Sequence, residues 1–157
     1  MYQRIAVAVD GSRVSDRALD EAIGVARLTH ATLLLLHVCE EIPLSWNVEE
    51  MSLVPLVDVS KAFVEAGRQL LAKASAHAAQ AGVHAETRLV EDYSGRIGAV
   101  ISEEARNWAA DLLVIGSHGR TGLDRWLMGS VAENVMRTAS MPVLLVRGSN
   151  PDKQGEL

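Results

Sequence analysis

Cysteine is almost missing from this sequence, since Cys39 is the only one in 157 residues. A single cysteine excludes an internal disulfide framework and is typical of a protein from a reducing compartment. No stretch reaches the roughly 18 apolar residues that a membrane-spanning helix needs. The opening residues, MYQRIAVAVD, show a strand pattern in place of the basic and apolar segments of a signal peptide. We therefore expect a soluble cytoplasmic protein.

Aromatic residues make up only 4% of the chain, although 48% of the residues are hydrophobic. This composition predicts an aliphatic core, and a chain of 157 residues fits one domain of ordinary size. Basic residues are outnumbered, 15 against 20 acidic ones, which gives a net charge of −5. Because nucleic-acid backbones select clustered Lys and Arg, this balance argues against a general nucleic-acid binder.

Short apolar segments alternate with segments of helical periodicity along the chain. The expected strands are residues 5–9, 32–38, 83–90, 112–115 and 142–146, and the expected helices are 15–28, 59–81, 97–108 and 130–136. Five strands alternating with four helices predict an α/β fold: a single-domain, open parallel sheet with helices on both faces. The pattern alone does not determine the strand order.

Two stretches fall outside this alternation. Residues 40–58, from Glu40 to Asp58, have no clear period, and we expect either a lid over a site or a packing flap. Residues 148–157 have no apolar periodicity and predict a disordered tail, so the expected domain covers residues 1–147.

A glycine-rich loop separates the fourth apolar segment from the last helix. It begins with Gly116-Ser-His-Gly119 and ends, nine residues later, with Gly129-Ser130. Backbone N–H groups of such a loop can converge on one point, and the helix N-terminus adds its own N–H groups and the positive end of its dipole. The pattern therefore predicts a phosphate-binding cradle.

Asp10 follows the first apolar segment directly and begins the turn Asp10-Gly11-Ser12. If the first and fourth strands are neighbours, Asp10 faces the glycine-rich loop across the crevice in which open α/β sheets bind ligands. Its carboxylate could accept hydrogen bonds from ribose or hold Mg²⁺ carrying phosphates. The alternative is a turn residue that bonds its own backbone. The loop opposite favours the ligand role.

Ser130 also has a structural alternative, because Ser130-Val-Ala-Glu133 is a capping-box spacing. We expect Ser130 to cap the helix without ligand and to contact the ligand when it is bound, unless the backbone N–H alone makes the contact. Gly116 and Gly129 are best explained by the close approach of a ligand. Gly122 fits a simple turn.

The remaining residues of the loop indicate binding more than catalysis. Arg120 and Arg125 could neutralise phosphate charge or lie in solvent. His118 is interpreted as a surface residue, because no Ser or Cys nucleophile with a positioned partner is identified. The patterns G-x-x-x-x-G-K-[ST] and G-x-G-x-x-G are both missing, so an efficient phosphate-transfer enzyme is not expected and no catalytic residue is assigned.

The spacing of Gly116, Gly119, Gly129 and Ser130 resembles the ATP-binding subgroup of the universal stress protein family. VAVDGS near the start, LLLLHV after the first helix and PVLLVR at the end add to the resemblance, which covers about residues 2–147. It implies a Rossmann-like, adenine nucleotide alpha hydrolase-like sheet in the order 3-2-1-4-5, with strands one and four side by side.

The resemblance also implies a nucleotide site and a partner. Asp10, beside Gly11, would contact ribose or metal, and the backbone near Val38 would meet adenine. The phosphates of ATP, with Mg²⁺ bound through them, would be held by the backbone N–H groups of Gly119, Gly129, Ser130 and Val131. Arg120 would be a further nucleotide-binding residue. The family typically dimerises through its last strand, here residues 142–146, from Pro142 to Val146. The sequence agrees with a homodimer, because this apolar edge carries no charge before Arg147.

These observations favour an ATP-binding regulatory protein of the stress response, whose conformation or partner choice depends on nucleotide. One alternative is a slow metal-dependent ATPase or phosphotransferase that uses Asp10. Another is a dimeric scaffold that binds no nucleotide.

Overall fold

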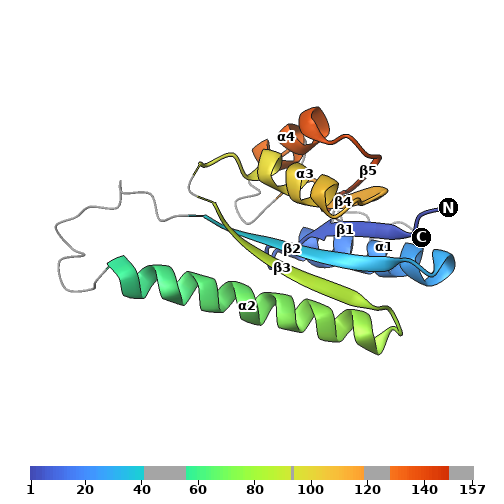
Figure 1. The fold of residues 1–157 in the computed structure, drawn as a ribbon, viewed down its shortest axis with the longest axis horizontal. Coiled ribbons are helices and arrows are strands. Elements are labelled where there is room, and N and C mark those ends of the chain that lie inside the picture. The colour runs from blue at the N-terminus through green and yellow to red at the C-terminus, as the bar shows by residue number, and fades with distance from the viewer. Residues whose placement is uncertain (41–55, 93, 119–127, 149–157) are drawn as a thin grey trace, which may run out of the picture.

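The computed structural model describes residues 1–40, 56–92, 94–118 and 128–148, and these form one parallel sheet between two helix layers (Figure 1). The strands are β1 (Arg4–Ala8), β2 (Thr32–Glu40), β3 (Ala85–Asp92), β4 (Leu112–Gly116) and β5 (Val143–Val146). The helices are α1 (Arg13–Thr29), α2 (Leu56–Gln80), α3 (Ile97–Asn107) and α4 (Ser130–Thr138). The strand order is β3-β2-β1-β4-β5, which confirms the expected order 3-2-1-4-5.

Each face of the sheet has its own apolar core. Val7, Leu33 and Leu35 point toward α1 and α2, and their neighbours Ala6 and Leu34 point toward α3 and α4. All five residues of β4 are buried, as expected for a central parallel strand covered on both faces. This two-sided burial explains why the strands read as continuous apolar runs.

The edge strand β3 departs from the expected pattern. It runs from Ala85 to Asp92, so it begins and ends two residues later than expected, and both Glu86 and Thr87 are exposed although they point to opposite faces of the strand. Glu86 accepts a hydrogen bond from Trp108 Nε1 over 3.1 Å. An edge strand covered on part of its length cannot keep a clean alternation of apolar and polar residues.

The amino end of β1 is tied to the turn between α3 and β4. The carboxylate of Asp111 accepts hydrogen bonds from the amides of Gln3 over 2.8 Å and Arg4 over 3.1 Å. The guanidinium of Arg4 lies 3.9 Å from the centroid of the Trp108 ring, and its Nε donates to the Trp108 carbonyl. These contacts fix β1 and β4 at the end of the sheet opposite the glycine-rich loop.

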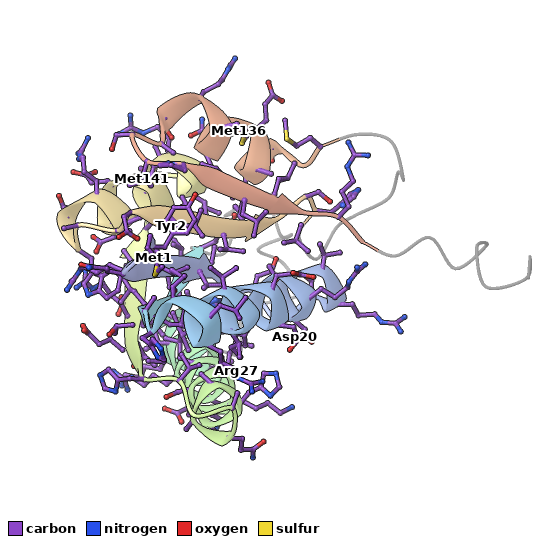
Figure 2. The ribbon with its side chains drawn as sticks, turned by 90° about the vertical axis from the view of Figure 1, so that its right-hand side faces the viewer. Met1, Tyr2, Asp20, Arg27, Met136 and Met141 are labelled. Atoms are coloured by element: carbon purple, nitrogen blue, oxygen red, sulfur yellow. The ribbon has the colours of Figure 1, made fainter. Side chains whose placement is uncertain are left out.

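The strand β5 forms the second edge of the sheet, opposite β3. Figure 2, turned by 90° from Figure 1, labels Tyr2 on the N-terminal segment and Met136 on α4, which are exposed by 36% and 50%. Among the described residues, no helix is both long and apolar enough to cross a membrane. The expected tail at 149–157 and most of the 40–58 segment lie outside the described residues.

Candidate functional site

Asp10 lies just past β1 in a turn that leads into α1. Its Oδ1 accepts a hydrogen bond from the amide of Ser12 over 2.8 Å, and Gly11 between them has a φ of 79°. The hydroxyl of Ser12 caps α1 by accepting from the amide of Ser15 over 3.2 Å. The turn role weighed for Asp10 is therefore observed, and it holds the carboxylate at the carboxyl end of β1.

One peptide unit, between Val9 and Asp10, is held by side chains at both of its polar atoms. The carbonyl oxygen of Val9 lies 2.8 Å from Nδ1 of the buried His37, and the amide of Asp10 donates to Ser15 Oγ over 3.0 Å. A carbonyl can only accept, so Nδ1 of His37 carries the proton. The sequence analysis missed this contact, because it joins residues that are 28 positions apart.

Gly116 ends β4 against the first turn of α1. A Cβ atom at Gly116 would lie 2.8 Å from Cγ1 of Val14 and 3.4 Å from the carbonyl oxygen of His118. The sequence analysis explained this glycine by the close approach of a ligand, and the packing of α1 on the end of β4 is a second, independent reason for it.

Helix α4 begins at the expected residue, Ser130, but its N-cap differs from the prediction. Its N-cap is Gly129, with φ −63° and ψ 154°, and no side chain of the described residues caps it. Ser130 is the first helical residue and is exposed, so the expected capping role of Ser130 is wrong for this structure. The carbonyl of Gly129 instead accepts from the amide of Glu133 over 2.9 Å. Among the described residues, no side chain, including the hydroxyl of Ser130, caps the start of α4.

Ser117 connects the start of α4 to the sheet. Its carbonyl accepts from the amide of Gly129 and its own amide donates to the carbonyl of Val146, both over 2.8 Å. Its hydroxyl lies 2.6 Å from Nδ1 of His118, so His118 has a serine partner that the sequence analysis did not identify. Ser117 is only 4% exposed.

Val131 and Val38 lie on the α3–α4 side of the sheet, both half-buried against the same core. The first turn of α4 rests on Gly98 of α3, where a Cβ atom would come within 2.7 Å of both the Val131 carbonyl oxygen and Cβ of Asn134. Close contact between α3 and α4 therefore sets the position of the helix N-terminus.

The sheet register brings the predicted site together. Val7 pairs with Val114, so Asp10, just past β1, and Gly116, the last residue of β4, lie at the same end of neighbouring strands, and the bond between Gly129 and Ser117 places the start of α4 beside Gly116. The site residues Gly119 and Arg120, and also Gly122 and Arg125, lie outside the described residues.

Asp92, which was not among the predicted site residues, ends β3 at the same end of the sheet as Asp10 and Gly116. The hydroxyl and the amide of Ser94 donate to its Oδ1 over 2.7 and 3.0 Å. These hydrogen bonds lower the pKa of Asp92, and the charge of Arg96 adds to the effect. Its Oδ2 is buried and has no hydrogen-bond partner among the described residues.

The fold and the position of the site define an open α/β protein with a topological switch point between β1 and β4, where proteins of this class bind ligands. The model of the universal stress protein family matches residues 1–147. Universal stress protein YxiE of Bacillus subtilis is 34% identical to the chain, and the match covers 94% of this chain and 100% of YxiE. The chain belongs to the universal stress protein family.

Solved structures agree in fold. The hypothetical protein MJ0577 has a TM-score of 0.80 and 27% identity, with 96% of this chain and 99% of that chain covered. A universal stress protein in complex with cAMP has a TM-score of 0.66 and 29% identity, with 94% and 99% covered. The Archaeoglobus fulgidus protein in complex with dAMP has a TM-score of 0.64 and 25% identity, with 92% and 98% covered.

Proposed function

We propose that this protein binds an adenine nucleotide, ATP in its regulatory state, in the crevice between β1 and β4, and that it acts as a nucleotide-dependent regulator in the cytoplasm. The proposal rests on the N-terminus of α4, uncapped in the described part of the chain. Among the described residues no side chain caps it, and Gly129 holds it beside Ser117 at the switch point. A helix N-terminus without a cap attracts phosphate. Relatives in complex with cAMP and dAMP support adenine as the base.

Each predicted site residue has a role in this proposal. The amides of Gly129, Ser130 and Val131 bind the phosphates, with Gly119 and Arg120 of the loop assisting them. The backbone at Val38 meets the base. Asp10, supported by Gly11, contacts ribose or magnesium.

The residues present fit a magnesium ion shared with the nucleotide. Among the described residues, no three His, Cys, Asp or Glu side chains gather in one place, so they do not form a cage of their own. Mg²⁺ is commonly held by one or two carboxylates together with substrate phosphates. Asp10 supplies one carboxylate, and the ion would neutralise phosphate charge.

Thermal unfolding with ATP, AMP, cAMP and GTP, each with and without Mg²⁺, tests the proposal. A ligand at a hundred times its Kd stabilises the folded protein by about 2.7 kcal/mol, which raises Tm by roughly 5–10 °C in a domain of this size. Gly129→Leu should remove the shift, because its backbone angles tolerate any residue, whereas in the proposed site a bulky side chain at this position would crowd the phosphates bound by its amide. Gly24→Leu is the matched control, since no atom of the described residues lies within 4 Å of its Cβ position. No shift with any adenine nucleotide at millimolar concentration would refute the proposal.

We also propose a homodimer through β5. The carbonyls of Pro142 and Val146 face β4, where they accept from Leu113 and Ser117. Because backbone groups alternate in direction along a strand, the polar groups of Val143 and Leu145 face outward. An unpaired edge of this kind is a template for another strand.

A further inference from the structure

The peptide unit between Val9 and Asp10 lies beyond the last residue of β1, Ala8, and its carbonyl is held by a side chain. Nδ1 of His37 donates to that carbonyl over 2.8 Å, and the amide of the same unit donates to Ser15 Oγ over 3.0 Å. Two side chains thus fix the plane of the peptide that carries Asp10.

The ring of His37 is itself fixed by α2. A Cβ atom at Gly67 would lie 2.7 Å from Cδ2 of His37, 2.8 Å from Cδ1 of Leu89 and 3.1 Å from Sγ of Cys39. A side chain at position 67 of α2 would therefore collide with this ring unless the ring moved. Gly67 therefore holds the imidazole against Val9, and His37 is 9% exposed.

We infer that His37 is a positioning residue of the nucleotide site, which acts by fixing the peptide that aims the Asp10 carboxylate at ribose or magnesium. The inference rests on the proposed function. The chain of contacts runs from Gly67 through His37 and Val9 to Asp10, where Ser12 fixes the carboxylate through its amide over 2.8 Å. His37 itself does not touch the ligand in this arrangement.

A pair of isosteric variants separates the hydrogen bond from the packing. In His37→Asn the amide nitrogen occupies the bond position of Nδ1 and keeps a donor, whereas His37→Leu has the same shape without one. We expect His37→Leu to bind Mg-ATP about three- to tenfold more weakly by titration calorimetry, the effect of one lost hydrogen bond. His37→Asn should stay within about twofold of the wild type.

A double-mutant cycle with Asp10→Asn tests whether His37 acts through Asp10. The coupling energy between the two substitutions in nucleotide affinity would be absent if His37 only stabilised the fold. If His37 acts through Asp10, the loss of affinity from His37→Leu should largely vanish once the carboxylate is gone. Leu33→Ala, on the same face of β2, is the stability control and should lower Tm without changing the affinity. If His37→Leu does not fold, Gly67→Ala displaces the ring while keeping the imidazole, and Gly24→Ala is its control.

The outcomes distinguish the two proposals. A wild-type protein that binds no adenine nucleotide overturns the proposed function and this inference with it. A wild type that binds, with Asp10→Asn weakened but His37→Leu unchanged, overturns the role of His37 alone. Additive losses in the cycle also overturn it.

Discussion

The amide of Gly129 donates to the carbonyl of Ser117 over 2.8 Å, so the N-cap residue of α4 is bound to the residue that follows β4. The amide of Ser117 in turn holds the carbonyl of Val146 at the end of β5. The described ends of the glycine-rich loop are therefore joined at a single residue, and the helix N-terminus is fixed to two strands.

Two serines at helix starts should respond differently to replacement by alanine. Ser12 caps α1 through its hydroxyl, so Ser12→Ala should destabilise the protein by about 1 kcal/mol. Ser130 makes no such cap, so Ser130→Ala should change the free energy of unfolding by less than about 0.5 kcal/mol, and nucleotide binding through the amide of residue 130 should persist. Urea unfolding and calorimetry check both values. An equal loss of stability in the two variants would contradict the assignment of Gly129 as the N-cap.

Gly98→Ala should destabilise the protein and weaken nucleotide binding together. The new methyl group would press on the carbonyl of Val131 and on Asn134, which overpacks the contact between α3 and α4 at a cost of roughly 1–3 kcal/mol. Gly24→Ala on α1 meets no described atom within 4 Å, and it should stabilise the protein by about 0.4–1 kcal/mol. Thermal unfolding and nucleotide titration of the two variants test this contrast. A tolerated methyl group at Gly98 would show that α3 and α4 yield at this contact.

The stability of the protein should fall in acid partly through Asp92. Hydrogen bonds from Ser94 lower the pKa of this carboxyl in the folded state, so its contribution is present above the unfolded-state pKa and is lost as pH falls through the folded-state value. The unfolded chain binds the proton more readily in this window, below about pH 4. Asp92→Asn should therefore flatten the slope of unfolding free energy against pH there. Unchanged slopes in urea titrations across that range would contradict the role of Asp92.

Val143→Pro should weaken the proposed homodimer without disrupting the sheet. Proline removes an amide that faces outward, whereas the contacts to β4 through the carbonyls of Pro142 and Val146 remain. Sedimentation should show a dimer for the wild type and a monomer at the same concentration for the variant. A wild-type monomer at tens of micromolar would exclude this interface as a stable one.

The sequence predicts the layers of this fold well because burial on both faces produces continuous apolar runs, as in β4. It also locates the strand ends that carry Asp10 and Gly116, since polar or glycine residues follow the runs directly. The strand order came from the family resemblance, because right-handed crossovers alone allow several orders.

The sequence could not predict which residue is the N-cap of α4. Glycine and serine are both favoured N-caps, and the spacing from Ser130 to Glu133 fits a capping box. The contact between Gly129 and Ser117 decides the matter, and it depends on the return of the chain to the end of β4. The close contacts between His37 and Gly67 and between Val14 and Gly116 were missed for the same reason. Each contact joins segments that only the folded sheet brings together.

The anchoring of β1 at Asp111 has a consequence for how such a protein can diversify. The two amides bound by this carboxylate hold the amino end of β1 beside β4, at the end of the sheet away from the loops of the proposed nucleotide site. Insertions or substitutions in those loops can then alter ligand preference while Asp10 and Gly116 stay level with each other. Changes at Asp111 or Arg4, in contrast, would disturb the alignment of β1 with β4 and therefore the site, whatever the sequence of its loops.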